Sequence, residues 1–140
     1  TLGLTVIIIT HEMSVVRQVC DSVSLLEAGR IVESGRLEDI VLDVDSRLSR
    51  EIVPFPKVPE AAVANGESVI DVSITAHPGQ PAAVALMSMV AELGGDIAAG
   101  VFETIGQAQI GRLAVTVPAS DTEQAVSTLR KAGIAAEVRS

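Results

Sequence analysis

Residues 68–140 predict an α+β sandwich, and three observations lead to it. Four short segments alternate apolar and polar residues, as half-buried strands do. Two helical segments separate them in the order strand, helix, strand, strand, helix, strand. Glycine or proline stands at most of the boundaries. With right-handed crossovers, this βαββαβ order gives a ferredoxin-like antiparallel sheet in strand order 4-1-3-2, with both helices on one face.

The first half of this unit begins with a strand at Val69–Thr75, where Ile70, Val72 and Ile74 alternate with polar residues. A loop containing His77 follows it. The first helix is expected over Ala82–Leu93, where Gly94 can adopt the left-handed conformation that ends a helix.

The second half continues with strands at Ile97–Ile105 and Arg112–Val117, joined by a turn over Gly106–Gly111. The sequence Ser120-Asp-Thr-Glu123 predicts a capping box that opens a helix at Asp121–Ala132. Ile134, Ala136 and Val138 mark the last strand.

Residues 1–53 have a different pattern. Thr5–Thr10 is an uninterrupted β-branched run, typical of a strand buried in a parallel sheet. His11 stands at its C-terminal end, where open α/β sheets place ligands. A short helix at Met13–Cys20, a hairpin turning at Ala28-Gly29 and a helical turn at Leu37–Leu42 are expected next.

Between these two parts, three prolines within Val53–Pro59 favour an extended spacer. We therefore predict a first domain over 1–53, a linker over 54–67 and a second domain over 68–140. Because Thr1 opens almost directly into a strand-like segment, we interpret the sequence as a fragment.

The composition excludes several functions. The net charge is −8 and the aromatic fraction is 1%, which argues against a nucleic-acid partner. The purely apolar run at Val6–Ile9 is far shorter than the ~20 residues that span a membrane. A single cysteine permits no internal disulfide, and no metal site is predicted.

The string VIIITHEMSVVRQVCDSVSLLEAGRIVESG resembles the end of an ABC-transporter ATPase domain. The resemblance implies that His11 is the switch histidine, which contacts the γ-phosphate of ATP in the complete domain with its Mg²⁺. Taken alone, His11 is better read as an exposed turn residue. The chain has no phosphate loop, no signature motif and no Walker B strand, so we expect no ATP hydrolysis from it alone.

The second domain is similar to the NIL regulatory domain at the C-terminus of the ATP-binding subunit of bacterial methionine ABC importers. The similarity covers Ser68–Ser140 and rests most on Asp96-Ile97 and on the segment Ile110–Leu113. The family has an asparagine-rich, more aliphatic stretch where this chain has Gly94–Ala98. The order of the two resemblances along one chain supports both.

This resemblance implies a domain that senses cytoplasmic L-methionine, forms a homodimer and inhibits transport. It also implies a transmembrane permease partner and a peripheral location on the cytoplasmic face of the bacterial inner membrane, although a fragment should be soluble. The expected ligand site includes Asp96, Ile97, Ala98 and His77. Small residues offer a slot for the thioether, Asp96 an acceptor for the ammonium group, and free strand-edge amides donors for the carboxylate. The alternative, that Asp96 is a plain cap or a solvated edge charge with no ligand, has nearly equal weight.

Two other functions remain open from the sequence. The second domain could be an ACT-like amino-acid sensor of a metabolic enzyme, or a plain dimerisation module without a ligand. The strand–His–helix–hairpin pattern of residues 1–53 disfavours the enzyme sensor. Only a binding measurement separates the methionine sensor from the dimerisation module.

Overall fold

The computed structural model describes residues 3–43, 45–76 and 82–139, with side chains described from Val84 onward in the last range. The helices are α1 (Met13–Val19), α2 (Leu37–Leu42), α3 (Arg47–Ile52), α4 (Ala82–Glu92) and α5 (Thr122–Lys131). The strands are β1 (Ser22–Glu27), β2 (Arg30–Arg36), β3 (Glu67–Ala76), β4 (Asp96–Ile105), β5 (Ala108–Pro118) and β6 (Ala135–Val138). Two short 3-10 turns, η1 (Glu60–Ala62) and η2 (Ala119–Asp121), lie between them.

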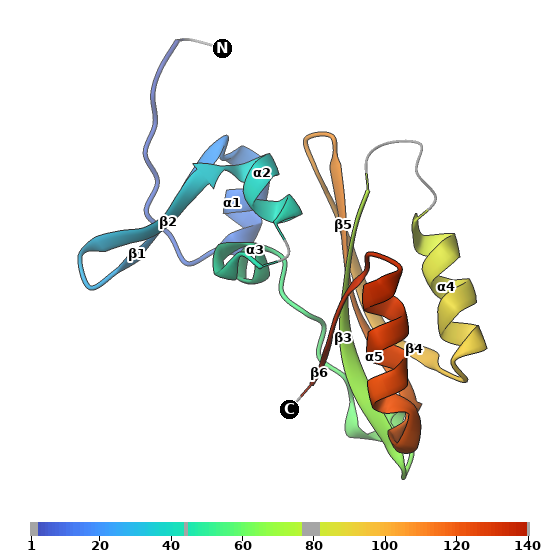
Figure 1. The fold of residues 1–140 in the computed structure, drawn as a ribbon. Helices are drawn as coiled ribbons and strands as arrows, with labels where there is room; N and C mark the ends of the chain where they lie inside the picture. Colours follow the sequence, from blue (N-terminus) through green and yellow to red (C-terminus); the bar gives the residue numbers. More distant parts are fainter. Residues whose placement is uncertain (1–2, 44, 77–81, 140) are drawn as a thin grey trace.

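The predicted ferredoxin-like fold is confirmed. The larger sheet is antiparallel in the order β4-β5-β3-β6, which is the predicted order of strands read from the other edge. Helices α4 and α5 cover one face of this sheet (Figure 1). The core between them is aliphatic because alternate residues of β3 and β5 meet the apolar faces of the two helices. Its buried members are Ile70, Val72, Ile74, Leu86, Val90, Leu113, Val115, Val117, Ala125, Val126, Leu129 and Ala136.

Two local predictions in this unit are wrong. The β4–β5 turn is only Gly106-Gln107, because the strands continue pairing up to Ile105 and Ala108. The capping box does not form, since α5 begins after η2 and has no side-chain hydrogen bond at its N-cap. Helix α4 ends at Glu92, and Gly94 two residues later has the predicted left-handed conformation, with φ of +70°.

The first segment forms the predicted hairpin of β1 and β2. Its turn residues Ala28 and Gly29 both have positive φ, 49° and 78°, as a type I′ turn requires. Helix α2 follows the hairpin directly and Leu37 N–H donates to the carbonyl of Asp21 at 2.9 Å. The short helix α3 was not predicted from the sequence.

The run Thr5–Thr10 forms no strand, which corrects the sequence prediction. Its apolar side chains are largely exposed, with Ile7 at 87% and Ile9 at 96%. A β-branched run forms a buried strand only when other strands lie on either side of it. Among the described residues, the two sheets consist of β1-β2 and β4-β5-β3-β6, and neither includes this run.

A second core lies on the face of the larger sheet opposite α4 and α5 (Figure 1). There α1, α2 and α3 pack against the β4–β5 hairpin, so residues far apart in the sequence share one apolar cluster. Its buried members are Val16, Leu37, Ile40, Val41, Leu48, Ile52, Val53, Ile105, Ala108 and Ile110.

Candidate functional site

The predicted ligand residues lie at the start of β4, an edge strand of the larger sheet. Asp96 is exposed, and its carboxylate Oδ1 accepts a hydrogen bond from the Ile97 amide at 2.8 Å. The register of β4 against β5 shifts between Ile97 and Ala99, which leaves Ala98 without a partner in β5. Ala98 is half-buried, and Ile97 packs against the first core. His77 lies outside the described residues.

The two glycines before β4 fix its starting point. Gly94 has a positive φ, whereas Gly95 sits so close to β5 that an added Cβ would lie 2.7 Å from the Thr116 carbonyl oxygen. Two surface hollows, of about 540 and 330 Å³, are lined by other residues than Asp96, Ile97 and Ala98. The structure places these three residues next to one another at the start of an edge strand.

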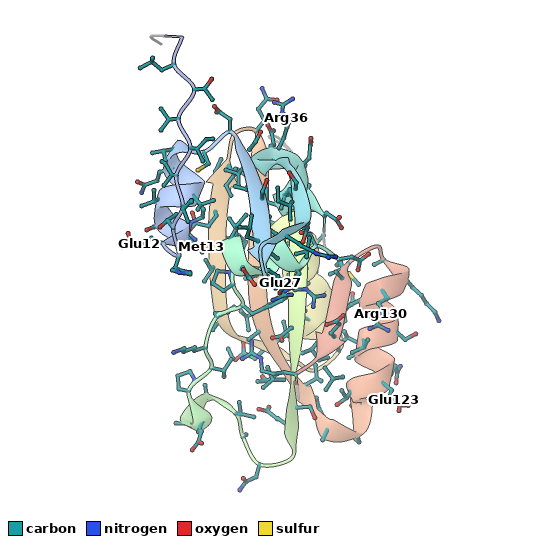
Figure 2. The ribbon with its side chains drawn as sticks, turned by 90° about the vertical axis from the view of Figure 1, so that its left-hand side faces the viewer. Glu12, Met13, Glu27, Arg36, Glu123 and Arg130 are labelled. Atoms are coloured by element: carbon teal, nitrogen blue, oxygen red, sulfur yellow. The ribbon has the colours of Figure 1, made fainter. Side chains whose placement is uncertain are left out.

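His11 is exposed and lies just before α1, which begins with Glu12 as its N-cap and Met13 as its first residue (Figure 2). The Glu12 amide donates to the Thr10 hydroxyl at 2.9 Å. This places His11 between the extended run and α1, with its side chain exposed to solvent. His11 and Asp96 belong to different elements that are joined through the second core and the larger sheet.

Helix α1 connects His11 to the opposite end of β4 from Asp96. The guanidinium of Arg17 lies 3.7 Å from the carboxylate of Glu103 and donates to the Ile52 carbonyl at 2.6 Å. At ~3.3 Å per residue, Glu103 is about 23 Å along β4 from Asp96. Strand β4 thus contacts the first segment at one end and carries the predicted ligand residues at the other.

The β4–β5 turn also contacts α2. The Gln107 amide donates to Oε1 of Glu38 at 3.2 Å. Gly106 has φ of +59°, and a Cβ at this position would lie 2.9 Å from Oε2 of Glu38. A glycine is needed here both for the turn and for the approach of the carboxylate.

The largest fully buried polar side chain among the described residues, Arg112, was missed by the sequence analysis. Arg112 comes directly before Leu113 in β5 and lies on the face of the sheet away from α4 and α5. It is completely buried, because α3 and the segment after it cover that face. Its Nε donates to the Val53 carbonyl at 3.0 Å, and its two terminal nitrogens donate to Ser73 Oγ at 2.6 Å and Ser49 Oγ at 2.7 Å.

The charge of Arg112 is held by neutral oxygens. Among the described residues no carboxylate lies within 4.0 Å of its guanidinium, and the ring centroid of Phe55 lies 5.4 Å from its Cζ. Burial, and after it the charge of Arg50, lower the pKa of Arg112 from its ordinary value. No local signal predicts this arrangement, since its partners are up to 63 residues away in the sequence.

No group of histidine, cysteine and carboxylate side chains with the arrangement of a metal site occurs in the part of the chain that the structure describes. None of its described helices is long and apolar enough to span a bilayer.

The chain is similar over nearly its whole length to curated methionine import ATP-binding proteins. It is 36% identical over 139 residues to that of Streptomyces griseus, covering 98% of this chain and 38% of the relative. It is 35% identical over 115 residues to one from Yersinia pestis, covering 81% of this chain and 34% of the relative. It is 32% identical over 138 residues to that of Myxococcus xanthus, covering 97% and 41%.

The chain therefore spans about two fifths of the length of the curated relatives it matches. No family model matches it. The resemblance to the ATP-binding subunits of methionine importers is confirmed by these relatives.

Proposed function

We propose that this chain, a homologue of methionine import ATP-binding proteins over 98% of its length, is the C-terminal part of such a subunit and regulates it. In this proposal the ferredoxin-like unit binds cytoplasmic methionine and thereby slows transport. The complete subunit binds ATP with Mg²⁺ and works with a permease at the cytoplasmic face of the inner membrane.

The shared second core is the observation that supports a regulatory role. A sensor can act on an ATPase only if a change in one is mechanically transmitted to the other. Here the β4–β5 hairpin contributes Ile105, Ala108 and Ile110 to the core that holds α1, α2 and α3. The two parts of the chain are therefore packed together, and the segment at 54–67 is not their only connection.

Strand β4 is the proposed path of this coupling. A ligand held by Asp96, Ile97 and Ala98 would fix the start of β4, and Glu103 near its end contacts Arg17 of α1. Helix α1 follows His11 directly, so a displacement of α1 would move the imidazole. Methionine must bind better when the two ATPase domains are separated, and a coupling of ~1–3 kcal/mol slows transport several-fold.

His11 has a chemically reasonable role in the complete subunit. An imidazole at the end of a strand can donate a hydrogen bond to a phosphate oxygen. His11→Ala should leave the stability of this chain unchanged because the side chain is exposed. In the complete subunit the same variant should lower ATP turnover sharply, and unchanged turnover would remove His11 from this role.

Titration calorimetry on the chain tests methionine binding. We expect saturable heat with L-methionine, none with D-methionine, and weaker binding in Asp96→Ala. Glu92→Ala removes a comparable exposed carboxylate at the end of α4 and is the matched control. A folded chain that shows no heat at millimolar L-methionine would contradict the sensor and leave only a dimerisation module.

A second experiment tests the coupling in the complete transporter. Cytoplasmic methionine should slow ATP turnover several-fold. Ile110→Asp places a charge in the second core and should reduce this inhibition while methionine still binds. Undiminished inhibition in this variant, with its shared core shown to be disrupted, would refute the proposed path.

A further inference from the structure

Residues 52–56, here called the strap, leave α3 and cross the face of the larger sheet that α4 and α5 do not cover (Figure 1). Val53 is fully buried in the second core, and Phe55 and Pro56 are half-buried. Because Pro54 and Pro56 lack an N–H donor, the carbonyl oxygens are the main backbone groups by which other elements can hold the strap.

Two consecutive carbonyl oxygens at the start of the strap accept hydrogen bonds from arginine side chains. Arg17 of α1 donates to the Ile52 carbonyl at 2.6 Å, and Arg112 of β5 donates to the Val53 carbonyl at 3.0 Å. Both carbonyls lie at the C-terminal end of α3, where the last carbonyls of a helix have no partner within it. The ring of Phe55 lies 5.4 Å from Arg112 Cζ, so the residues after α3 cover the same guanidinium.

The far end of the strap is held by Arg139, which directly follows β6. Its guanidinium donates to the Pro56 carbonyl at 3.0 Å and, through Nε, to Asp71 Oδ1 of β3 at 2.8 Å. The backbone amide of Arg139 also donates to the Val69 carbonyl at 2.9 Å. Arg139 is therefore fixed to the sheet by its backbone and by its side chain, and the Asp71 carboxylate holds the guanidinium in place against the strap.

We propose that the strap, fastened by Arg17, Arg112 and Arg139, joins the first segment and the ferredoxin-like unit into one rigid body. The three arginines come from α1, from β5 and from the end of β6, so both parts of the chain hold the strap. A flexible linker would let the two parts swing independently. In a rigid body, the length of the remaining connection at 57–66 does not set the relative positions of the two parts.

A rigid body determines how the proposed regulation acts. A movement of the ferredoxin-like unit then displaces α1, and His11 before it, by the full amount of that movement. A flexible connection would absorb the movement instead. This functional step rests on the proposed function, whereas the rigid body itself does not, and separate experiments test the two.

Amide hydrogen exchange on the 140-residue chain tests the rigid body. A helix of six residues is not stable by itself, so protection of the α3 amides reports their attachment to the rest of the chain. The Val53 amide, which donates to the Ser49 carbonyl at 3.0 Å, is a suitable probe. We expect its protection factor to lie within about tenfold of those in the interior of β3, and lower protection than this would overturn the proposal.

The double variant Arg17→Gln/Arg139→Gln removes two fastenings at side chains that are only 22% and 27% exposed, without changing the buried Arg112. It should lower the protection of Val53 relative to β3 at least about tenfold, because hydrogen bonds from charged donors are lost. The comparison with β3 separates this local release from a general loss of stability. A smaller change in the ratio would contradict the fastening role.

Arg130→Gln is the matched control. Arg130 donates through Nε to the Ala136 carbonyl at 2.9 Å, so this variant removes the same kind of bond inside the ferredoxin-like unit (Figure 2). The protection of Val53 relative to β3 should stay unchanged in it. An equal fall in Arg130→Gln and in the double variant would overturn the proposal, because the effect would then not depend on the strap.

An insertion in the complete transporter tests the functional step. Gly-Ser-Gly-Ser placed after the exposed Lys57 lengthens the connection beyond the strap. Inhibition of ATP turnover by methionine should be unchanged, because the strap and the second core still fix the two parts. Loss of inhibition with the strap amides still protected would refute the rigid-body step. A native transporter without inhibition would refute the proposed function and this step, while hydrogen exchange would still decide the rigid body.

Discussion

Replacing Arg112 should show how much the buried guanidinium contributes to holding the first segment on the sheet. Arg112→Met keeps much of the side-chain volume and removes the three hydrogen bonds to Val53, Ser73 and Ser49. The two serine hydroxyls can rotate, and Ser49 Oγ already donates to the Val41 carbonyl at 3.1 Å. The Val53 carbonyl oxygen cannot adjust in this way, and it loses the hydrogen bond from Arg112 Nε.

The magnitude follows from these contacts. A buried carbonyl without a donor costs about 1–3 kcal/mol, and removing a buried cation returns part of its desolvation cost. We therefore expect Arg112→Met to lower the free energy of unfolding by about 1–2 kcal/mol. Arg112→Ala also leaves a cavity under α3 and should cost about 3–5 kcal/mol in total.

Urea unfolding followed by circular dichroism measures both effects, since the chain has no tryptophan or tyrosine to report by fluorescence. Arg36→Ala, which changes an exposed arginine, is the control and should shift the free energy by less than about 0.5 kcal/mol. A loss below about 1 kcal/mol in Arg112→Ala would refute the reasoning, because a fully buried side chain with three partners cannot be removed so cheaply.

Four further substitutions, one of them a control, test other features. Gly95→Ala should cost about 2–3 kcal/mol because its Cβ would lie 2.7 Å from a backbone carbonyl oxygen of β5. Gly106→Ala should cost about 1–2 kcal/mol through its positive φ and the displacement of Glu38. Gly133→Ala, with positive φ and open space, is the control for both, and equal losses in all three by urea unfolding would contradict the steric argument. We also expect the homodimer implied by the resemblance to form through the edge strand β4, so Ala98→Arg should disrupt it by placing a charge in the interface. Sedimentation that shows the native chain to be a monomer would contradict this expectation.

The alternating pattern of β3 and β5 was sufficient to predict the sheet. Ile70, Val72 and Ile74 face the helices as their spacing predicts, and the topological rules leave one sensible order for four strands and two crossovers. Local backbone chemistry was equally informative at Gly94 and at the Ala28-Gly29 turn. The capping box predicted for α5 does not form, because the 3-10 turn η2 occupies Ala119–Asp121 where the cap was expected.

For the candidate ligand residues, the sequence predicted their place in the fold but not whether a ligand site surrounds them. Asp96, Ile97 and Ala98 do start the edge strand, since the helix-ending glycines precede them. Whether a ligand site surrounds them depends on packing and association, which local patterns do not encode. The surface hollow lined by Asp45, Phe55 and Glu137 was not predicted for the same reason, because its walls come from residues far apart in the sequence.

In residues 68–140 the sequence by itself determined the order of strands and helices and the side of β3 on which the aliphatic side chains lie. This holds because alternation depends on neighbours within a few residues. The tertiary structure alone decided that the polar face of the sheet is covered and that Arg112 is buried there by α3 and Val53. A side chain's burial depends on which segment packs over it, and here that segment is about sixty residues away.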